Sequence, residues 1–243
     1  EEFRDLDLSD EEIISKEFEE CTFVNCDFSE VQLRHCIFED CRFLKCNLSV
    51  MKVDGCRFSN VVFEESKLSG IDWTKAIYSD ILLDSPLTFL NCIVDYSSFY
   101  GLTLQSLVMR ECKAYDVDFR ESDLSGCDLR ESDLTDTLFR NTNLSGADLT
   151  LAENYTIDIN VNTIKGAKFS RYAALSLLDG LEITLVAPRP ELVYLPSLIW
   201  IPAGLRSGDD LEINLENFFR RLRVKFHQGE ASGIRDGGRV VET

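Results

Sequence analysis

A repeat of five residues constrains this chain more than any other feature. Written in fives from Cys21, the sequence reads CTFVN CDFSE VQLRH CIFED CRFLK CNLSV, and the third residue of every unit is large and apolar. The third residues continue as Val53, Phe58, Phe63, Leu68, Trp73 and Tyr78. The first residue of most units is small or medium-sized and apolar. A period of five fits neither an α-helix, which repeats about every 3.6 residues, nor a flat strand, which repeats about every two.

The physics of such a unit predicts a coil. Each unit places two side chains, two residues apart, on the inside of a short extended segment, and a corner follows. Four units close a square coil of about twenty residues, and coils stack at the ~4.8 Å spacing of paired strands. Stacking buries an apolar column that no single coil could bury alone. The sequence therefore predicts an all-β fold, a right-handed quadrilateral β-helix of about eight coils and ~35–40 Å over residues 1–169.

The frame of five shifts once. Around Asp84, Ser85 and Pro86 it slips by one residue, and the second register runs through units such as SDLSG, CDLRE, SDLTD and ADLTL to Phe169. Pro86 fixes φ and lacks a backbone donor. A register slip is thus expected near 84–88. Two interpretations stay open: a bulge that only joins two stretches of coil, and a small loop that marks a binding surface.

The cysteines follow the repeat. All occupy the first, inward position of a unit: Cys21, Cys26, Cys36, Cys41, Cys46, Cys56, Cys92, Cys112 and Cys127. Several pairs are twenty residues apart and are expected to stack on one face. A buried cysteine behaves as a small hydrophobe, and the spacing is not that of a zinc site. We therefore interpret the cysteines as packing residues.

The pattern changes after Phe169. Ser170 can cap a helix, and Tyr172, Leu175, Leu178 and Leu181 recur every three residues, which keeps them on one side of a short helix. Residues 181–186 read as a short strand. Because the end of a solenoid exposes apolar surface, residues 170–186 are predicted to form a C-terminal capping helix and strand. The apolar side of the helix packs on the last coil, on another subunit or on both.

The segment 187–243 is different again. It holds four of the five prolines, and its end is rich in glycine. An amphipathic helix over 211–226 is one interpretation of its apolar spacing. The sequence predicts an appended segment, partly disordered, and assigns it no role.

The charge lies on the repeats. The chain carries 43 acidic and 25 basic residues, a net charge of −18, and the whole excess falls within residues 1–186. Such a surface repels nucleic acid, whose phosphates need Lys and Arg, and attracts basic surfaces instead. Direct nucleic-acid binding is therefore not expected. Acidity that serves only solubility is the plainer alternative.

Catalytic chemistry is not evident in the sequence. A filled coil offers no cleft in which polar groups converge. The two histidines, His35 and His227, are far apart, and neither a nucleophile set nor a phosphate loop nor a metal cluster is apparent. No run of apolar residues is long enough for a membrane helix. The sequence predicts no enzyme, no cofactor, no metal and no membrane span.

Two resemblances narrow the interpretation. The units SDLSG, CDLRE, SDLTD and ADLTL resemble the A(D/N)LXX signature of the pentapeptide-repeat family. The Cys- and Phe-rich units CTFVNCDFSE and CIFEDCRF, and the end IKGAKFSRYAALSLLDGLEITLV, look like those of the Qnr and MfpA group of quinolone-resistance proteins. Two features depart from that group: the large projecting loops of some Qnr proteins have no counterpart beyond the slip, and residues 187–243 are foreign to it.

The resemblance implies a function. Members of the group are cytoplasmic homodimers joined through their C-terminal segments, which gives Tyr172, Leu175, Leu178 and Leu181 the cap and dimer contact. They act as DNA mimics that occupy the DNA-binding saddle of DNA gyrase or topoisomerase IV and protect it from quinolones. Outward acidic residues become the candidates to replace phosphates: Asp116, Asp118, Glu121, Asp123, Asp128, Asp133 and Asp148. The alternative is a non-catalytic scaffold that binds another protein partner, with specificity in 187–243.

Overall fold

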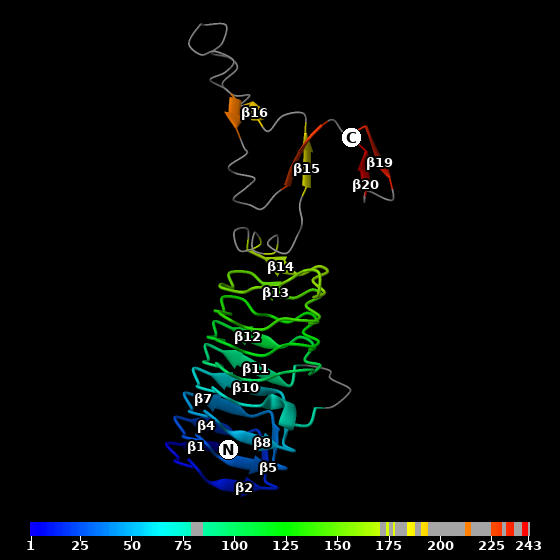
Figure 1. Cartoon of the computed structure of the whole chain (residues 1–243). Helices are drawn as coiled ribbons and strands as arrows, with labels where there is room; N and C mark the ends of the chain where they lie inside the picture. Colours follow the sequence, from blue (N-terminus) through cyan, green and yellow to red (C-terminus); the bar gives the residue numbers. More distant parts are fainter. Residues whose placement is uncertain are drawn as a thin grey trace, which may run out of the picture. The chain divides into compact units, whose positions relative to one another are not determined.

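The computed structural model describes residues 1–78, 85–170, 174, 177, 184–187, 191–193, 212–214, 225–229, 232–235 and 240–242. The chain divides into two compact units, Glu1–Leu178 and Asp179–Thr243. The first unit is a parallel β-solenoid, and its strands follow one another along the stack of coils (Figure 1). The predicted all-β coil is therefore confirmed. The three-segment division at 169 and 186 stays a prediction.

The coil has four faces, numbered here in chain order. Face 1 carries β1 (Glu2–Arg4), β4 (Thr22–Val24), β7 (Arg42–Leu44), β10 (Val61–Glu64), β11 (Leu87–Leu90), β12 (Val108–Arg110), β13 (Asp148–Leu149) and β14 (Lys168–Phe169). Face 2 is built from single bridges, beginning with Asp7, Asp27 and Asn47. Face 3 carries β2 (Glu12–Ile14), β5 (Gln32–Arg34), β8 (Lys52–Asp54) and the 3-10 helix η1 (Trp73–Lys75). Face 4 carries β3 (Glu17–Glu19), β6 (Ile37–Glu39) and β9 (Arg57–Ser59).

The register is strict on both sides of one break. Partners on face 1 are twenty residues apart from Glu2 to Val62 and again from Thr88 to Lys168, which makes seven such steps, and the step across the break is the eighth. Across the break the offset is 26, because Val62 pairs with Thr88. Six residues are therefore inserted between Tyr78 and Leu87. The predicted slip of one residue is wrong in size, since a five-residue frame cannot distinguish one extra residue from six.

The insertion separates an N-terminal segment, residues 1–78, from a C-terminal segment, residues 85–170. Pro86 returns the chain to the coil: its carbonyl accepts a hydrogen bond from the Val61 amide at 3.1 Å, and β11 begins at the next residue. Because Pro86 precedes the strand, its missing N–H breaks no ladder bond within β11. The parallel pairing of β10 with β11 then resumes the coil.

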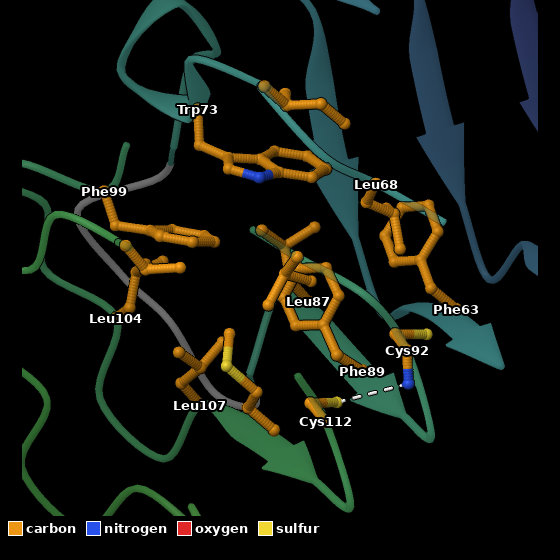
Figure 2. Packing of buried hydrophobic residues seen from close by; sticks show 14 of the residues in the cluster. Phe63, Leu68, Trp73, Leu87, Phe89, Cys92, Phe99, Leu104, Leu107 and Cys112 are labelled. Atoms are coloured by element: carbon orange, nitrogen blue, oxygen red, sulfur yellow. Dashed lines mark hydrogen bonds between the residues drawn. The ribbon is translucent and has the colours of Figure 1, made fainter. Parts of the chain in front are cut away.

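The third residues of the units fill the core as stacked columns. On face 1 the rings of Phe3, Phe23, Phe43, Phe63 and Phe89 stack with centroids 4.7–5.3 Å apart. On face 3 Trp73 stacks on Phe99 at 5.9 Å, and Phe99 stacks on Phe119 at 5.0 Å. Figure 2 shows how these rings and neighbouring leucines fill the coil where the two segments meet. Such pairs add stability beyond the apolar area that they bury.

The first residues of the units complete the interior. All the cysteines are buried and free, which confirms their predicted packing role. Burial raises the pKa of Cys41 and Cys46 to about 11, so neither is a reactive thiolate at neutral pH. Small hydroxyl residues replace cysteine in the same columns: the Cys112 amide donates to Ser132 Oγ at 3.1 Å, and Ser132 Oγ donates to the Met109 carbonyl at 2.9 Å.

The C-terminal end of the solenoid is partly described. Leu177 is buried in the core, and Ala174 packs against it while its amide donates to the Ser170 carbonyl at 2.9 Å. The rest of the predicted capping helix lies outside the described residues. In the part of the chain that the structure describes, no helix has the length and apolarity needed to cross a bilayer.

The second unit contains short strands. β15 (Thr184–Ala187), which overlaps the strand predicted over 181–186, pairs in parallel with β18 (Lys225–Gln228). β16 (Glu191–Val193) is antiparallel to β17 (Glu212–Asn214), and β19 (Gly233–Arg235) to β20 (Val240–Glu242). The helix considered over 211–226 is wrong at both ends, where β17 and the start of β18 are extended.

Candidate functional site

The outward aspartates of the C-terminal segment are first of all turn residues. The aspartates at the second position of a unit accept a hydrogen bond from the backbone amide two residues later. The N–O distances are 3.0 Å for Ser125 to Asp123, 3.2 Å for Thr135 to Asp133 and 3.0 Å for Thr150 to Asp148. An aspartate that bonds the backbone two residues on stabilises a tight turn. These carboxylates therefore have a structural role in the repeat, whatever else they bind.

Arginines neutralise part of this charge. Arg120 forms two hydrogen bonds with Asp118, at 2.9 and 2.8 Å. Asp128 lies between Arg130 and Arg110 and accepts from both. Although burial acts to raise the pKa of Asp128, the hydrogen bonds from Arg130 and Arg110 lower that pKa to about 2. Asp128 is thus ionised at any physiological pH, and its charge is largely paired.

Amide side chains bridge the carboxylates of successive coils. Asn143 donates to Asp123 at 2.9 Å, and Asn141 donates to Glu121 at 2.7 Å. In the N-terminal segment Asn25 donates to Asp5 at 2.6 Å. Each of these asparagines lies twenty residues after an acidic residue. A second acidic residue at that position would repel the first. At these positions stacking therefore places a neutral donor, rather than a second charge, against each carboxylate.

The seven candidate acids do not share a face. Asp128 and Asp148 lie on face 1, Asp133 on face 2, Asp118 on face 3 and Asp123 on face 4. Two further candidates occupy corners, where they adopt positive φ: Asp116 at the end of face 2 and Glu121 at the end of face 3. Asp116, Glu121 and Asp133 are exposed, whereas the other four are half-buried. The structure thus distributes these residues around the coil rather than gathering them.

The densest charge lies elsewhere. Residues 1–40, the first two coils, hold 14 acidic and three basic residues, whereas residues 41–78 hold four acidic and six basic ones. Residues 85–170 hold 13 acidic and seven basic residues. Four exposed glutamates in the first coil have no ion pair among the described residues: Glu11, Glu17, Glu19 and Glu20. The sequence prediction overlooked this end because it counted charge over the whole repeat; counting coil by coil would have found it.

The remaining predicted site residues divide into two groups. The cap and dimer candidates Tyr172, Leu175, Leu178 and Leu181 lie outside the described residues. His35 is an exposed corner residue, as predicted, and His227 is exposed in β18. Within the described residues, no group of three or more His, Cys, Asp and Glu side chains is arranged to hold a metal ion.

Comparisons with known proteins identify the family. A family model for a pentapeptide repeat region matches residues 16–99, and one for eight copies of the pentapeptide repeat matches residues 108–152. Together they cover just over half of the chain. The chain belongs to the pentapeptide-repeat family. The resemblance to the Qnr group is borne out at the level of the fold, because a Qnr protein is among the solved structures that match.

Two solved pentapeptide-repeat structures illustrate the range of matches. A trypsin-treated variant of QnrB1, a plasmid-mediated fluoroquinolone resistance protein, is 20% identical with a TM-score of 0.53, and the match covers 73% of this chain and 96% of that one. HetL of the cyanobacterium Nostoc sp. strain PCC 7120, involved in heterocyst differentiation regulation, is 17% identical with a TM-score of 0.27, covering 68% of this chain and 88% of HetL. No curated protein matches the sequence significantly. At such identity the QnrB1 match establishes the fold.

Proposed function

We propose that this pentapeptide-repeat protein is a non-catalytic DNA mimic that binds a type II topoisomerase, DNA gyrase or topoisomerase IV, and protects it from quinolones or modulates it. The proposal includes the cytoplasm as its compartment and a homodimer joined through the C-terminal segment. Its family membership and its structural similarity to QnrB1, a plasmid-mediated fluoroquinolone resistance protein, support the proposal.

The charge density along the coil carries the proposal. Duplex DNA carries one phosphate charge per ~1.7 Å of axis. Eight steps of ~4.8 Å make the solenoid ~38 Å long, and the net charge of the described residues 1–170 is −15. The solenoid therefore carries one net negative charge per ~2.5 Å of its axis, which approaches the linear charge density of duplex DNA. The first two coils, with a net charge of −11 over ~10 Å, exceed it.

This charge distribution indicates which acidic residues contribute most to binding. The first two coils present unpaired carboxylates at high density, so we infer that they contribute most to binding a basic DNA-binding surface. Most of the seven acids of the C-terminal segment, Asp116 to Asp148, contribute less, because turn amides, an asparagine side chain and arginines already share the charge of all of them except Asp116. Long-range attraction of this kind weakens with salt.

A supercoiling assay tests the proposal. Purified full-length protein is added to DNA gyrase, relaxed plasmid and a fluoroquinolone, and then to topoisomerase IV in a decatenation assay. We expect protection from the drug at substoichiometric to stoichiometric protein, or inhibition at higher amounts. Neither effect on either enzyme at a large excess of protein would contradict the proposal.

A scaffold is the second candidate, and the separate unit Asp179–Thr243 is the observation that favours it. If the scaffold is right, partner capture from a lysate depends on that unit. Pull-downs with the full chain and with residues 1–178 distinguish the two, provided that circular dichroism shows the shortened chain to be folded. Capture of topoisomerase by both proteins supports the mimic, and tail-dependent capture of another protein supports the scaffold.

A further inference from the structure

The outward column of face 3 contains one interruption. From Lys113 to Lys168 the second position of every unit is polar or charged except at Leu138, which stands where neighbouring units have Asp133 and Asn143. Leu138 pairs with Asp118 of the preceding coil and is 40% exposed. An exposed leucine in place of the turn-forming aspartate gives up a backbone hydrogen bond, so it needs another explanation.

Leu138 lies at the floor of a hollow. The hollow has a volume of about 620 Å³ and lies over face 3 in the sixth and seventh coils. Tyr115, Asp116 and Asp136 line one edge, and Arg120 and Arg140 line the other. Such a volume lies within the range of small ligand sites, about 300–1,000 Å³. An exposed apolar residue between two charged edges is typical of a site that binds a side chain of a partner, and not of a coil face that only contacts water.

The acidic edge contains the exposed Tyr115, whose ring contacts a second exposed tyrosine, Tyr96. The rings of Tyr96 and Tyr115 lie 5.4 Å apart at an interplanar angle of 78°, and 60% and 40% of these residues are exposed. The charge of Asp136, together with its hydrogen bond to the Tyr115 hydroxyl, raises the pKa of Tyr115. The phenol is therefore protonated at neutral pH and keeps donating to Asp136. A ring face beside carboxylates attracts a cation.

The basic edge of the hollow contains one arginine that, unlike most arginines of the solenoid, forms no ion pair among the described residues. Among the described residues 1–78 and 85–170, six of the eight arginines form an ion pair, and only Arg57 and Arg140 do not. Arg120 pairs with Asp118 and lies over the Tyr100 ring at 5.8 Å. Arg140 is exposed and is thus free to donate to a carbonyl or carboxylate of a bound segment.

We propose that this hollow anchors a protein partner through a basic residue adjacent to an apolar residue. The apolar side chain packs on Leu138, the guanidinium or ammonium group lies between the Tyr115 ring and the Asp116 and Asp136 carboxylates, and Arg140 donates to a backbone carbonyl of the bound segment. Aromatic and arginine side chains around an apolar centre are typical of residues that dominate binding energy. The net charge of −18 favours a basic partner.

A dipeptide probe tests the site directly. The full ¹⁵N-labelled chain is titrated with N-acetyl-Arg-Leu-amide and followed by amide NMR shifts. We expect saturable shifts clustered at Tyr115, Asp116, Asp136 and Leu138. The neutral isostere N-acetyl-citrulline-Leu-amide should bind at least about fivefold more weakly, since it loses a cation–π and ion-pair contribution of about 1 kcal/mol. Unsaturable shifts spread over the acidic residues of all faces would overturn the proposal.

Variants provide the second arm. Leu138→Asn introduces a residue that the repeat accepts at this position, as at Asn143, and removes the apolar floor without changing charge. We expect it to weaken the dipeptide at least about fivefold. The matched control is Leu151→Asn, at an exposed leucine on a face 1 corner, which should bind as the natural protein does. Equal binding by Leu138→Asn and the natural protein would overturn the site.

The inference rests on the proposed function only in taking the partner to be a protein. If topoisomerase is unaffected while the dipeptide binds at Leu138, the DNA-mimic proposal fails and this site stands. If topoisomerase is protected while the dipeptide shows no saturable binding, this site fails alone.

Discussion

The N-terminal and C-terminal segments of the solenoid obey the same five-residue rule with different chemistry. Residues 1–78 hold eight phenylalanines and six of the nine cysteines, and their inward columns are mainly stacked rings and thiols. Residues 85–170 hold five phenylalanines, and leucine with buried Ser, Thr and Ala takes the same positions. The N-terminal segment concentrates its negative charge in two coils, whereas the C-terminal segment pairs its acids with arginines and amides. The repeat thus fixes which positions face inward and leaves surface charge free to vary.

The largest expected difference concerns the core. Phe43→Ala removes a ring stacked on Phe23 at 4.7 Å and on Phe63 at 5.1 Å, and should cost about 3–5 kcal/mol. Leu129→Ala, in the same face 1 column, should cost about 1 kcal/mol less because no ring stacking is lost. Urea unfolding followed by circular dichroism measures both. Equal losses would show that aromatic stacking does not distinguish the two segments.

A smaller effect concerns the paired acids of the C-terminal segment. Asp128→Asn should reduce stability by about 1–2 kcal/mol at pH 7, since the Arg110 and Arg130 bonds that lower the pKa of Asp128 to about 2 are weakened. Because the pKa of Asp128 in the folded protein lies below its ordinary value of 3.8, the ionised carboxylate stabilises the folded state at pH values above about 3.8. This stabilisation is lost as the pH falls toward 2. Unfolding midpoints at pH 7 and pH 2.5 should therefore differ more for the natural protein than for the variant. A pH-independent difference between the two proteins would contradict this origin.

The smallest effect concerns the unpaired acids of the first coil. Replacing Glu11, Glu17, Glu19 and Glu20 by Gln should raise stability by up to about 1 kcal/mol at low ionic strength, because like charges repel less. The gain should vanish in about 1 M salt, where the Debye length is ~3 Å. Thermal unfolding at both ionic strengths checks it. A gain that persists in salt would indicate side-chain packing rather than charge.

Much of the fold could be predicted because apolar residues recur at the inward positions of almost every unit. The five-residue frame is enough to place Phe23, Trp73 and the cysteines in the core. The same frame misjudges the insertion, because it records an offset only modulo five and six extra residues look like one. The cap could not be judged from Tyr172 and its neighbours, which lie outside the described residues.

The candidate site was less predictable. Sequence spacing marked Asp123 and Asp133 as outward, but it could not show that each accepts a turn amide or that the seven acids occupy all four faces. Leu138 was missed, although its signal was present: it is the apolar exception in a polar outward column. A search for residues that break the outward pattern would have found it.

The central claim, that the first two coils act as the DNA-mimicking surface, is tested most directly by competition with DNA. The experiment measures how well three proteins displace duplex DNA from gyrase. They are the natural protein, a variant with Gln at Glu11, Glu17, Glu19 and Glu20, and a matched variant with Gln at Glu111, Glu121, Glu131 and Glu153. We predict displacement by the natural protein and a loss of about tenfold or more for the first variant, with a markedly smaller loss for the second. No displacement, or equal losses for the two variants, would contradict the claim.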